Sequence, residues 1–311
     1  MHQKRFAIVC AAGIGDALIT SIAAHHLRKQ GAKATLFSPH LQNFGHWLEE
    51  GEYLPYAEDW AEALGSFDAV LLQHDNTLRA RSILKLRDLG MPVYVLYTNY
   101  RLSKHGPLLQ GFDFPFDESR PMVENTQAAI QELFGIEASK RCSLSPPAYL
   151  SHRKYPKRVF IHPTSTSEDK NWPKERFFQL AKKLEKRDFE TLFILSPTDR
   201  ASFPADIPAP LFETLGALAD ALYESGAFIG NDSGPAHLAS YFSIPLAVIC
   251  QGRQMPLWSP GWHSPLLIRP PRWVPNIKGM RLRENKWKHF ITTKVVLKKF
   301  LKTLNQNRKT L

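Results

Sequence analysis

The stretch AFIGNDSGPAH, residues 227–237, decides the fold because it joins a buried strand to a helix through one tight turn. Its apolar start predicts a strand, and its glycine–proline pair predicts the turn and the first residue of a helix. Free N–H groups and the positive end of the helix dipole then lie beside Ser233 and His237. Such a turn favours a phosphate or diphosphate, and an ordinary helix start capped by Asp232 or Ser233 is the alternative.

A second strand-to-helix junction lies earlier, in TSTSEDKNWP at residues 164–173. It follows the apolar segment 158–162 and precedes a helical pattern over 174–186. Its hydroxyl groups can donate to phosphate or ribose oxygens, and Lys170 can lie against a leaving diphosphate. A capped, solvated loop with Trp172 buried under the helix is the alternative.

The first strand, predicted over residues 6–11, leads into the sequence AAGIGD at 11–16. A G-x-G pattern after a strand is typical of dinucleotide sites, but Leu18 stands where the third glycine belongs and no acid follows the second strand. A nicotinamide site is therefore disfavoured. Asp16 remains as a carboxylate at the carboxyl end of the strand, where open α/β sheets bind ligands. A helix N-terminal acid that complements the dipole is the alternative.

Together the three segments resemble glycosyltransferase family 9, the bacterial heptosyltransferase family of lipopolysaccharide core assembly. In that family a G-D pair opens the first helix, a T-T-x-D-D-K-x-W-P loop opens the second domain, and D-[ST]-G-x-x-H-x-A lies at a later turn. The corresponding segments here are Gly15-Asp16, residues 165–173 and residues 232–239, in the same order. The resemblance extends from about Phe6 to about Trp258.

The resemblance implies an α/β protein of GT-B architecture, with two Rossmann-like doubly wound domains facing across a cleft. It implies an inverting sugar transfer that needs no metal ion and no cofactor. The expected substrates are a nucleotide-diphosphate sugar, such as ADP-heptose, and an anionic glycolipid acceptor of the lipopolysaccharide or lipooligosaccharide core. A nucleotide-sugar-binding protein, or an epimerase of the same architecture, is the alternative.

Residue roles follow from the same resemblance. Asp16 would be the general base, and Lys170 would stabilise the charge that develops on the diphosphate. The residues expected to bind the donor are Ser165, Thr166, Asp232, Ser233, Gly234 and His237. His237, one turn into its helix, either touches the phosphate or packs against the sheet.

Acceptor recognition is expected from a loop-rich stretch at 98–121. Arg101, Lys104 and His105 in this stretch are candidate contacts for an anionic acceptor, and a solvated loop is the alternative. Residues 252–256 read GRQMP where the family has G-P-T-D-P, and residues 260–288 are rich in Pro, Trp and Arg. The identities of the donor sugar and of the acceptor therefore stay open.

The chain of 311 residues suits two domains. We expect an acceptor-side domain over 1–154 and a nucleotide-sugar domain over 155–290, with a C-terminal helix at 291–305 packing back on the first. Repeating strand and helix patterns predict a doubly wound sheet in each. The strands are expected at 6–11, 34–37, 69–73, 93–97, 158–162, 191–195, 228–230 and 246–250, and a helix is expected at 122–134.

The net charge of +11 is concentrated near the end of the chain, where residues 286–311 hold eight Lys or Arg and no acid. An apolar stripe through Leu297, Phe300, Leu301 and Leu304 predicts a helix with a basic face. That face could rest on anionic lipid of the inner membrane. Nucleic acid is disfavoured as a partner because no binding motif accompanies the charge.

The hydropathy pattern contains no apolar run of the ~20 residues that a spanning helix requires. The N-terminus reads as a strand and turn rather than a signal peptide, so a cytoplasmic protein is expected, at most at the cytoplasmic face of the inner membrane. The cysteines Cys10, Cys142 and Cys250 lack metal or disulfide spacing and are expected in the core. The sequence does not indicate an oligomeric state.

Overall fold

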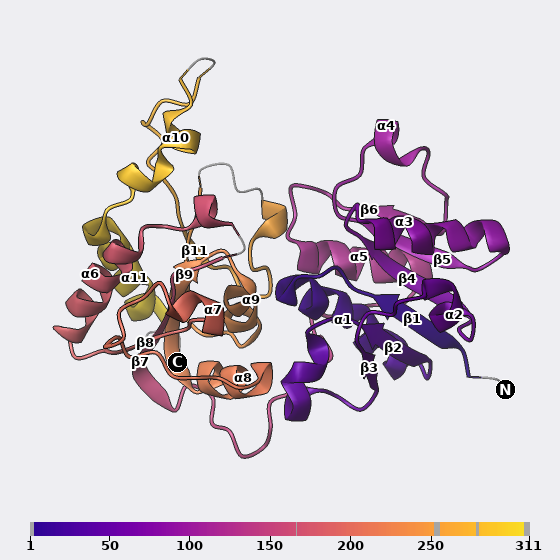
Figure 1. Ribbon diagram of the computed structural model, residues 1–311, viewed down its shortest axis with the longest axis horizontal. Helices are drawn as coiled ribbons and strands as arrows, with labels where there is room; N and C mark the ends of the chain where they lie inside the picture. Colours follow the sequence, from indigo (N-terminus) through magenta and orange to yellow (C-terminus); the bar gives the residue numbers. More distant parts are fainter. Residues whose placement is uncertain (1–2, 166, 252–255, 278–279, 308–311) are drawn as a thin grey trace. The chain divides into compact units, whose positions relative to one another are not determined.

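A computed structural model describes residues 3–165, 167–251, 256–277 and 280–307 (Figure 1). The chain forms two compact units. Unit 1 consists of Met1–Pro147 and Thr214–Gly216, and unit 2 of Ala148–Glu213 and Ala217–Leu311. Unit 2 begins at Ala148, seven residues before the start expected at 155, and its first strand begins at Tyr155.

Unit 1 is built on a parallel sheet with the strand order β3-β2-β1-β4-β5-β6. Its strands are β1 (Arg5–Val9), β2 (Lys33–Phe37), β3 (Glu52–Leu54), β4 (Ala69–His74), β5 (Val93–Tyr97) and β6 (Asp113–Pro115). Its helices are α1 (Ile14–Lys29), α2 (Trp60–Leu64), α3 (Leu78–Leu84), α4 (Leu102–His105) and α5 (Met122–Phe134), with 3₁₀ turns η1 (Leu41–Trp47) and η2 (Lys85–Leu89).

Alternation along β1 explains why helices cover both faces of this sheet. Ala7 and Val9 belong to a buried cluster that includes side chains of α2 and α3. Phe6, which immediately precedes Ala7, points to the other face and meets Phe134 of α5 edge to face at 5.7 Å. Strands buried on both faces read as continuous apolar runs, which is why the sequence of β1 predicts a parallel sheet.

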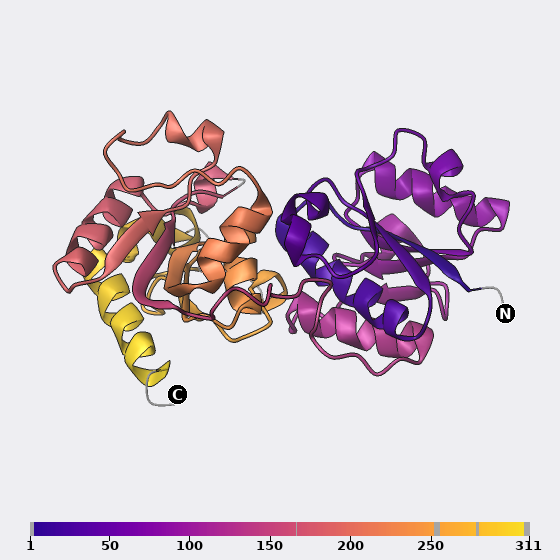
Figure 2. The same ribbon diagram turned by 90° about the horizontal axis from the view of Figure 1, so that it is seen from below.

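Unit 2 repeats the plan with a parallel sheet in the order β11-β10-β9-β7-β8 (Figures 1 and 2). Its strands are β7 (Tyr155–His162), β8 (Glu190–Phe193), β9 (Ser225–Asn231), β10 (Leu246–Ile249) and β11 (Leu266–Ile268). Its helices are α6 (Lys174–Glu185), α7 (Pro197–Arg200), α8 (Leu215–Tyr223), α9 (Gly234–Tyr241), α10 (Leu282–Asn285) and α11 (Thr293–Asn307). Its 3₁₀ turns are η3 (Glu168–Lys170), η4 (Pro256–Trp258) and η5 (Trp287–Phe290).

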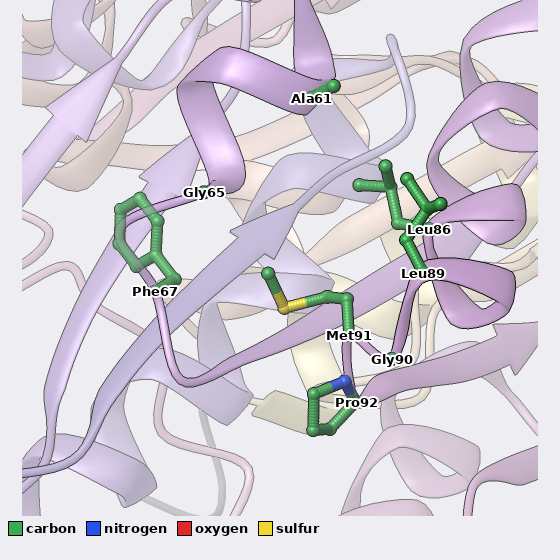
Figure 3. A pocket seen from close by; sticks show the side chains of 8 residues that line it. All are labelled: Ala61, Gly65, Phe67, Leu86, Leu89, Gly90, Met91 and Pro92. Carbon is green, nitrogen blue, oxygen red and sulfur yellow. The ribbon is translucent and has the colours of Figure 1, made fainter.

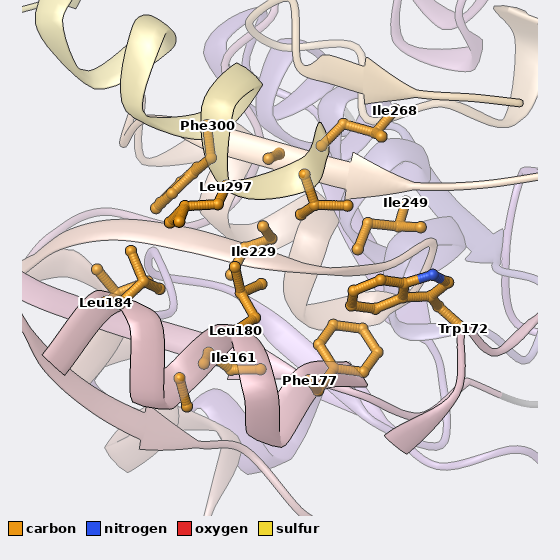
Figure 4. Close-up of a cluster of buried hydrophobic side chains, with 14 of the residues drawn as sticks. Ile161, Trp172, Phe177, Leu180, Leu184, Ile229, Ile249, Ile268, Leu297 and Phe300 are labelled. Atoms are coloured by element: carbon orange, nitrogen blue, oxygen red, sulfur yellow. The ribbon is translucent and has the colours of Figure 1, made fainter. Parts of the chain in front are cut away.

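The core of unit 2 lies between one face of this sheet and the helices α6 and α11 (Figure 4). Phe177 and Leu180 come from α6, Ile229 comes from β9, and Leu297 and Phe300 come from α11. Figure 2 shows α11, in yellow, beside α6. The helix therefore belongs to unit 2, where its apolar stripe is buried, and the expected packing back on the first domain stays a prediction.

Most regular elements agree with the sequence patterns. Helix α5 has the bounds expected from the sequence, as does β5, and the other expected strands differ by a few residues at their ends. The short strands β3, β6 and β11 were not expected, because three residues are too few to show a period. No helix in the described part of the chain combines the length and apolar composition needed to cross a bilayer.

Replacing Phe300 by Ala tests the place of α11 in the unit 2 core. Phe300 is fully buried, so we expect a loss of about 3–5 kcal/mol in the free energy of unfolding, from lost apolar contact and the cavity left behind. Val295→Ala is the matched control, because Val295 lies on the same helix and is 41% exposed. Equal urea midpoints for the two variants would contradict this assignment.

Candidate functional site

Asp16 lies in the first turn of α1, just beyond the carboxyl end of β1. Its Oδ1 accepts a hydrogen bond from Gln73 Nε2 at 2.8 Å. Gln73 is buried near the end of β4, and its Oε1 accepts from the Ala11 N–H at 3.0 Å and from the Thr20 hydroxyl at 2.6 Å. The amide is thereby fixed with its NH₂ toward Asp16, which holds the carboxylate in one orientation.

The environment of Asp16 favours proton exchange near neutral pH. Burial raises the pKa of Asp16 to about 6, the Gln73 hydrogen bond lowers it, and the negative charge of Asp75 raises it further. A carboxylate with a pKa near the working pH is ionised at pH 7 and still binds a proton well, which suits a general base.

Beside Asp16 lies a polar cluster that the sequence reasoning missed. Arg79 pairs with Asp75, and its guanidinium stacks on the ring of Tyr56 at 4.1 Å. The Tyr56 hydroxyl donates to the Cys10 carbonyl at 2.8 Å. Arg79 Nε is buried and has no hydrogen-bond partner among the described residues. The signal available in the sequence was the position of Asp75, directly after the last residue of β4.

The three residues expected to bind the acceptor lie at and around α4, after β5. Arg101 is paired with Glu118 at 3.1 Å on the surface, and Lys104 is exposed. His105 is more constrained: its Nε2 hydrogen-bonds Asn76 Oδ1 at 2.7 Å. Its ring also packs against the rings of His74, Tyr97 and Tyr100, with centroids 5.1 to 5.7 Å away. The stretch that was predicted to be a loop therefore contains a structured cluster of aromatic rings.

In unit 2 the turn at Ser233 begins α9 without a side-chain cap. Ser233 has extended backbone angles (φ −162°, ψ 167°), and its Oγ donates to the Asn231 carbonyl at 3.2 Å. The capping alternative is therefore excluded for Ser233 in this structure. The Gly234 N–H lies at the positive end of the helix dipole, which favours anions, whereas Pro235 has no N–H and the Ala236 and His237 N–H groups donate to the Ser233 carbonyl at 3.0 and 3.3 Å.

Asp232 and His237 flank this turn as half-buried groups. Burial raises the pKa of Asp232 to about 6, and the charge of Lys170 lowers it. Burial lowers the pKa of His237 to about 4, so its imidazole is neutral at pH 7. Asp232 Oδ1 and His237 Nδ1 are both buried without a hydrogen-bond partner within the described ranges. His237 also contacts the Trp262 ring edge to face at 6.5 Å.

The hydroxyl-rich loop precedes α6 in the same unit. Ser165 donates to Asn171 Oδ1 at 2.7 Å, and Lys170 is exposed at the end of η3. The effect of Lys170 on the pKa of Asp232 places the two charges near each other. Thr166 lies outside the described residues, as do positions 252–255 of the departing GRQMP segment.

Asn231 ties this loop to the Ser233 turn, and sequence reasoning did not single it out. Its side chain is fully buried at the end of β9. Its Nδ2 donates to the Pro163 carbonyl at 2.6 Å, and its Oδ1 accepts from the Trp172 N–H at 3.0 Å. One amide therefore fixes the backbone on both sides of the loop. The signal in the sequence was an asparagine at the end of a buried strand, because such a strand needs no polar side chain for its own packing.

A pocket of about 560 Å³ opens at the carboxyl end of β7, beside this loop. Thr164, Ser165, Asp199, Lys174 and Lys288 contribute polar groups to its lining, and the Thr164 hydroxyl donates to Asp199 at 3.1 Å. Its lining thus combines hydroxyl groups with two lysines and the three carboxylates Glu168, Glu175 and Asp199, as a site for a polar ligand requires. Within the described ranges there is no group of three or more His, Cys, Asp or Glu side chains that could hold a metal ion.

Unit 1 has a pocket of a different kind, of about 360 Å³ (Figure 3). It is lined by apolar side chains such as Phe67, Leu86 and Met91, together with Pro92 and two glycines. Phe67 and Met91 precede β4 and β5, so this pocket lies at the amino ends of the strands, opposite the end that carries Asp16. It lacks groups for acid–base chemistry.

Known proteins resemble this chain in sequence and in fold. Residues 100–249 match the family described as Glycosyltransferase family 9 (heptosyltransferase). The fold is similar to that of Escherichia coli ADP-heptose LPS heptosyltransferase II, with 17% identity, coverage of 98% of this chain and 99% of that chain, and a TM-score of 0.70. No curated protein matches the sequence.

Two further solved structures have similar folds. E. coli heptosyltransferase WaaC with ADP is 17% identical, over 96% of this chain and 99% of that chain, with a TM-score of 0.65. The iron-containing dodecameric glycosyltransferase TibC from enterotoxigenic E. coli H10407 is 14% identical, over 99% of this chain and 78% of that chain, with a TM-score of 0.57.

The two parallel-sheet units and these matches define an α/β glycosyltransferase fold of the GT-B class. The family match then assigns residues 100–249 to glycosyltransferase family 9. The resemblance is confirmed over this segment, which contains the second and third sequence motifs, and Gly15-Asp16 lies outside it.

Replacing Asn231 by Ala tests its role in joining the loop to the turn. The variant leaves the Pro163 carbonyl and the Trp172 N–H unpaired in a buried place, so we expect a loss of roughly 2–4 kcal/mol in the free energy of unfolding. Asn305→Ala, at an exposed position, is the control and should change little. Denaturant unfolding measures both, and an unaffected Asn231→Ala would contradict the assignment.

Proposed function

We propose that the protein is an inverting glycosyltransferase that moves a heptose from a nucleotide-diphosphate donor to an anionic acceptor of the lipopolysaccharide core. The donor proposed is ADP-heptose. The observation that carries the proposal is the pairing of a motif with an environment: Asp16, in the position of the family's G-D pair, is a half-buried carboxylate fixed by Gln73 with a pKa near 6. The matches to heptosyltransferase structures support the sugar class.

In the proposed reaction Asp16 takes the proton from an acceptor hydroxyl as that oxygen attacks the anomeric carbon. A new carbon–oxygen bond forms on one face of the sugar while the bond to the diphosphate breaks on the other, so the configuration inverts. The diphosphate leaves with the bonding electron pair. Asp16 is suited to this step because its hydrogen bond with Gln73 fixes its direction and its pKa lets it hold the proton.

Unit 2 is proposed to hold the donor and to stabilise the leaving diphosphate. Lys170 supplies a mobile positive charge, the Gly234 N–H supplies a donor at the positive end of α9, and the Ser233 hydroxyl would turn from the Asn231 carbonyl to a phosphate oxygen. Ser165 and Thr166 add hydroxyl groups, and Asp232 orients the turn or the donor sugar. His237, neutral at pH 7, can donate a hydrogen bond to a phosphate oxygen without adding charge. Lys170 and the positive end of α9 at Gly234 are proposed to take the place of a metal ion.

Acceptor binding is proposed for Arg101, Lys104 and His105, whose side chains could contact anionic groups of the glycolipid. Because such an acceptor is membrane-bound, we propose that the protein works at the cytoplasmic face of the inner membrane. The exposed lysines of α11, such as Lys298 and Lys302, would then lie toward anionic lipid.

Asp16→Asn tests the general base. The variant keeps the shape of the side chain and an acceptor for Gln73 but cannot take a proton, so kcat should fall roughly 10²- to 10⁴-fold with donor affinity unchanged. In the unmodified protein kcat/KM should rise with pH through about 6, because only the ionised carboxylate accepts the proton. Initial rates with donor and glycolipid acceptor measure both.

Asp88→Asn, an exposed acid in η2, is the matched control and should keep full activity. Full activity of Asp16→Asn would remove Asp16 from the base role. Donor conversion that proceeds equally without acceptor would instead indicate the epimerase alternative, since transfer requires an acceptor.

Lys170→Ala tests the cationic contact with the donor. Losing one charged hydrogen bond should raise the Kd for ADP roughly tenfold to a hundredfold, measured by calorimetric titration. Lys182→Ala, an exposed lysine on α6, should leave the Kd unchanged. Equal affinities of both variants would contradict a phosphate contact, and loss of activity in excess chelator would contradict metal independence.

A further inference from the structure

Between β11 and α11 the chain leaves the sheet of unit 2 and forms a projection that carries α10 (Figure 1). Its described residues 271–277 and 280–283 are called the Trp273 hairpin below. Ile277 and Met280 close it through reciprocal backbone hydrogen bonds of 3.2 and 2.9 Å, and the Arg283 N–H donates to the Pro275 carbonyl at 3.2 Å. Backbone hydrogen bonds thus join the described residues on the two sides of positions 278–279.

Large apolar side chains are exposed on this hairpin. Trp273 is 75% exposed, Ile277 66% and Met280 48%. Single exposed apolar residues are ordinary on a protein surface, but three on one short projection form a group that points to a partner.

The base of the hairpin is fixed to unit 2, so these side chains are held out of the core. Val274 and Trp287 are buried. Glu284, 8% exposed, accepts from Asn276 Nδ2 at 2.8 Å, and its backbone carbonyl accepts from Gln251 Nε2 at 2.8 Å. Because the base is already held in place, less conformational entropy is lost when the outer part binds a partner.

Charge distinguishes this surface from an ordinary apolar patch. Residues 269–288 contain seven Lys or Arg and one acid, Glu284. That acid is buried and lies 3.6 Å from Arg281. Arg272, Arg281 and Lys286 are exposed, so this segment carries accessible cations as well as its exposed tryptophan and two exposed aliphatic side chains.

We propose that the Trp273 hairpin docks on the surface of an anionic lipid bilayer. Trp273 would lie among the headgroups with Ile277 and Met280 at the acyl boundary, and Arg272 and Arg281 would contact lipid phosphates. Tryptophan prefers this boundary because its ring is apolar and its N–H is polar, and basic residues are attracted to the negative surface. A bilayer meets both needs without the shaped groove that a protein partner would require.

The basic helix α11 cannot provide the apolar part of such a contact. Its apolar stripe, including Leu297 and Phe300, is buried in the core of unit 2. Its outer face carries lysines such as Lys298 and Lys302, and Val295 is the one large apolar side chain exposed on it among the described residues. The inference thus goes beyond the proposed transfer reaction: it assigns lipid contact to a surface that carries none of the proposed donor, acceptor or base residues.

The test is co-sedimentation of the full chain with vesicles of phosphatidylcholine alone or mixed with phosphatidylglycerol. We expect partitioning to the mixed vesicles only. Trp273→Ala should reduce it about tenfold, through the lost apolar burial, and Arg272→Ala about fivefold. Leu211→Ala is the matched control, because Leu211 is 73% exposed in unit 2 outside the hairpin, and it should bind like the unmodified chain.

A fluorescence measurement reads the same contact without relying on loss of binding. Brominated lipids should quench part of the emission of the unmodified chain, and Trp273→Phe should lose that quenching while still binding. Thermal unfolding midpoints should be equal for all variants, since the substituted side chains are exposed.

Some outcomes would overturn the proposal. They are equal binding to neutral and anionic vesicles, unchanged binding of Trp273→Ala, and quenching that persists in Trp273→Phe. Absence of vesicle binding together with self-association that Trp273→Ala abolishes would also overturn it, and would assign the hairpin to a protein contact. Donor binding and transfer are measured separately and do not enter these outcomes.

Discussion

In a sheet whose strands all run in one direction, every strand delivers its carboxyl end to the same edge, and the rest of this structure depends on that constraint. The backbone turns there into helices, so helix N-termini and strand-end side chains gather in one place. In unit 1 the edge collects Asp16, Gln73 and Asp75. In unit 2 it collects the Ser165 loop and the turn at Asp232. The position of the polar groups in both sites therefore follows from the parallel topology of the sheets rather than from any single strand.

Two buried amides make these edges into defined sites. Gln73 uses its oxygen to satisfy the Ala11 N–H and the Thr20 hydroxyl, which leaves its NH₂ for Asp16. Asn231 joins the two sides of the loop in unit 2 in the same way. Buried polar groups are costly unless every bond is made, so each amide permits one arrangement of its neighbours. The half-buried carboxylates Asp16 and Asp232 depend on that rigidity, because their raised pKa values come from burial.

Helix α11 shows how one segment can have two faces with different roles. Its apolar stripe completes the core of unit 2, and its lysines remain in solvent. The Trp273 hairpin reverses this division, since its base is polar and buried while its outer part is apolar and cationic. Composition alone gives both segments the same description, basic and apolar. The direction in which the apolar side chains point separates a core helix from a surface contact.

The sequence by itself determined the two parallel sheets, the bounds of β5 and α5 and the junctions at Asp16, Lys170 and Ser233, because period and turn residues are local signals. It also carried the family resemblance, since each of the three motifs is a contiguous run of residues. Tertiary structure decided what depends on distant neighbours: the unit that α11 completes, the pairing of Gln73 with Asp16 across 57 positions, the tie made by Asn231, and the cluster around Arg79. Side chains far apart in sequence leave no periodic trace, so their contacts appear only when the strands are aligned in the sheet.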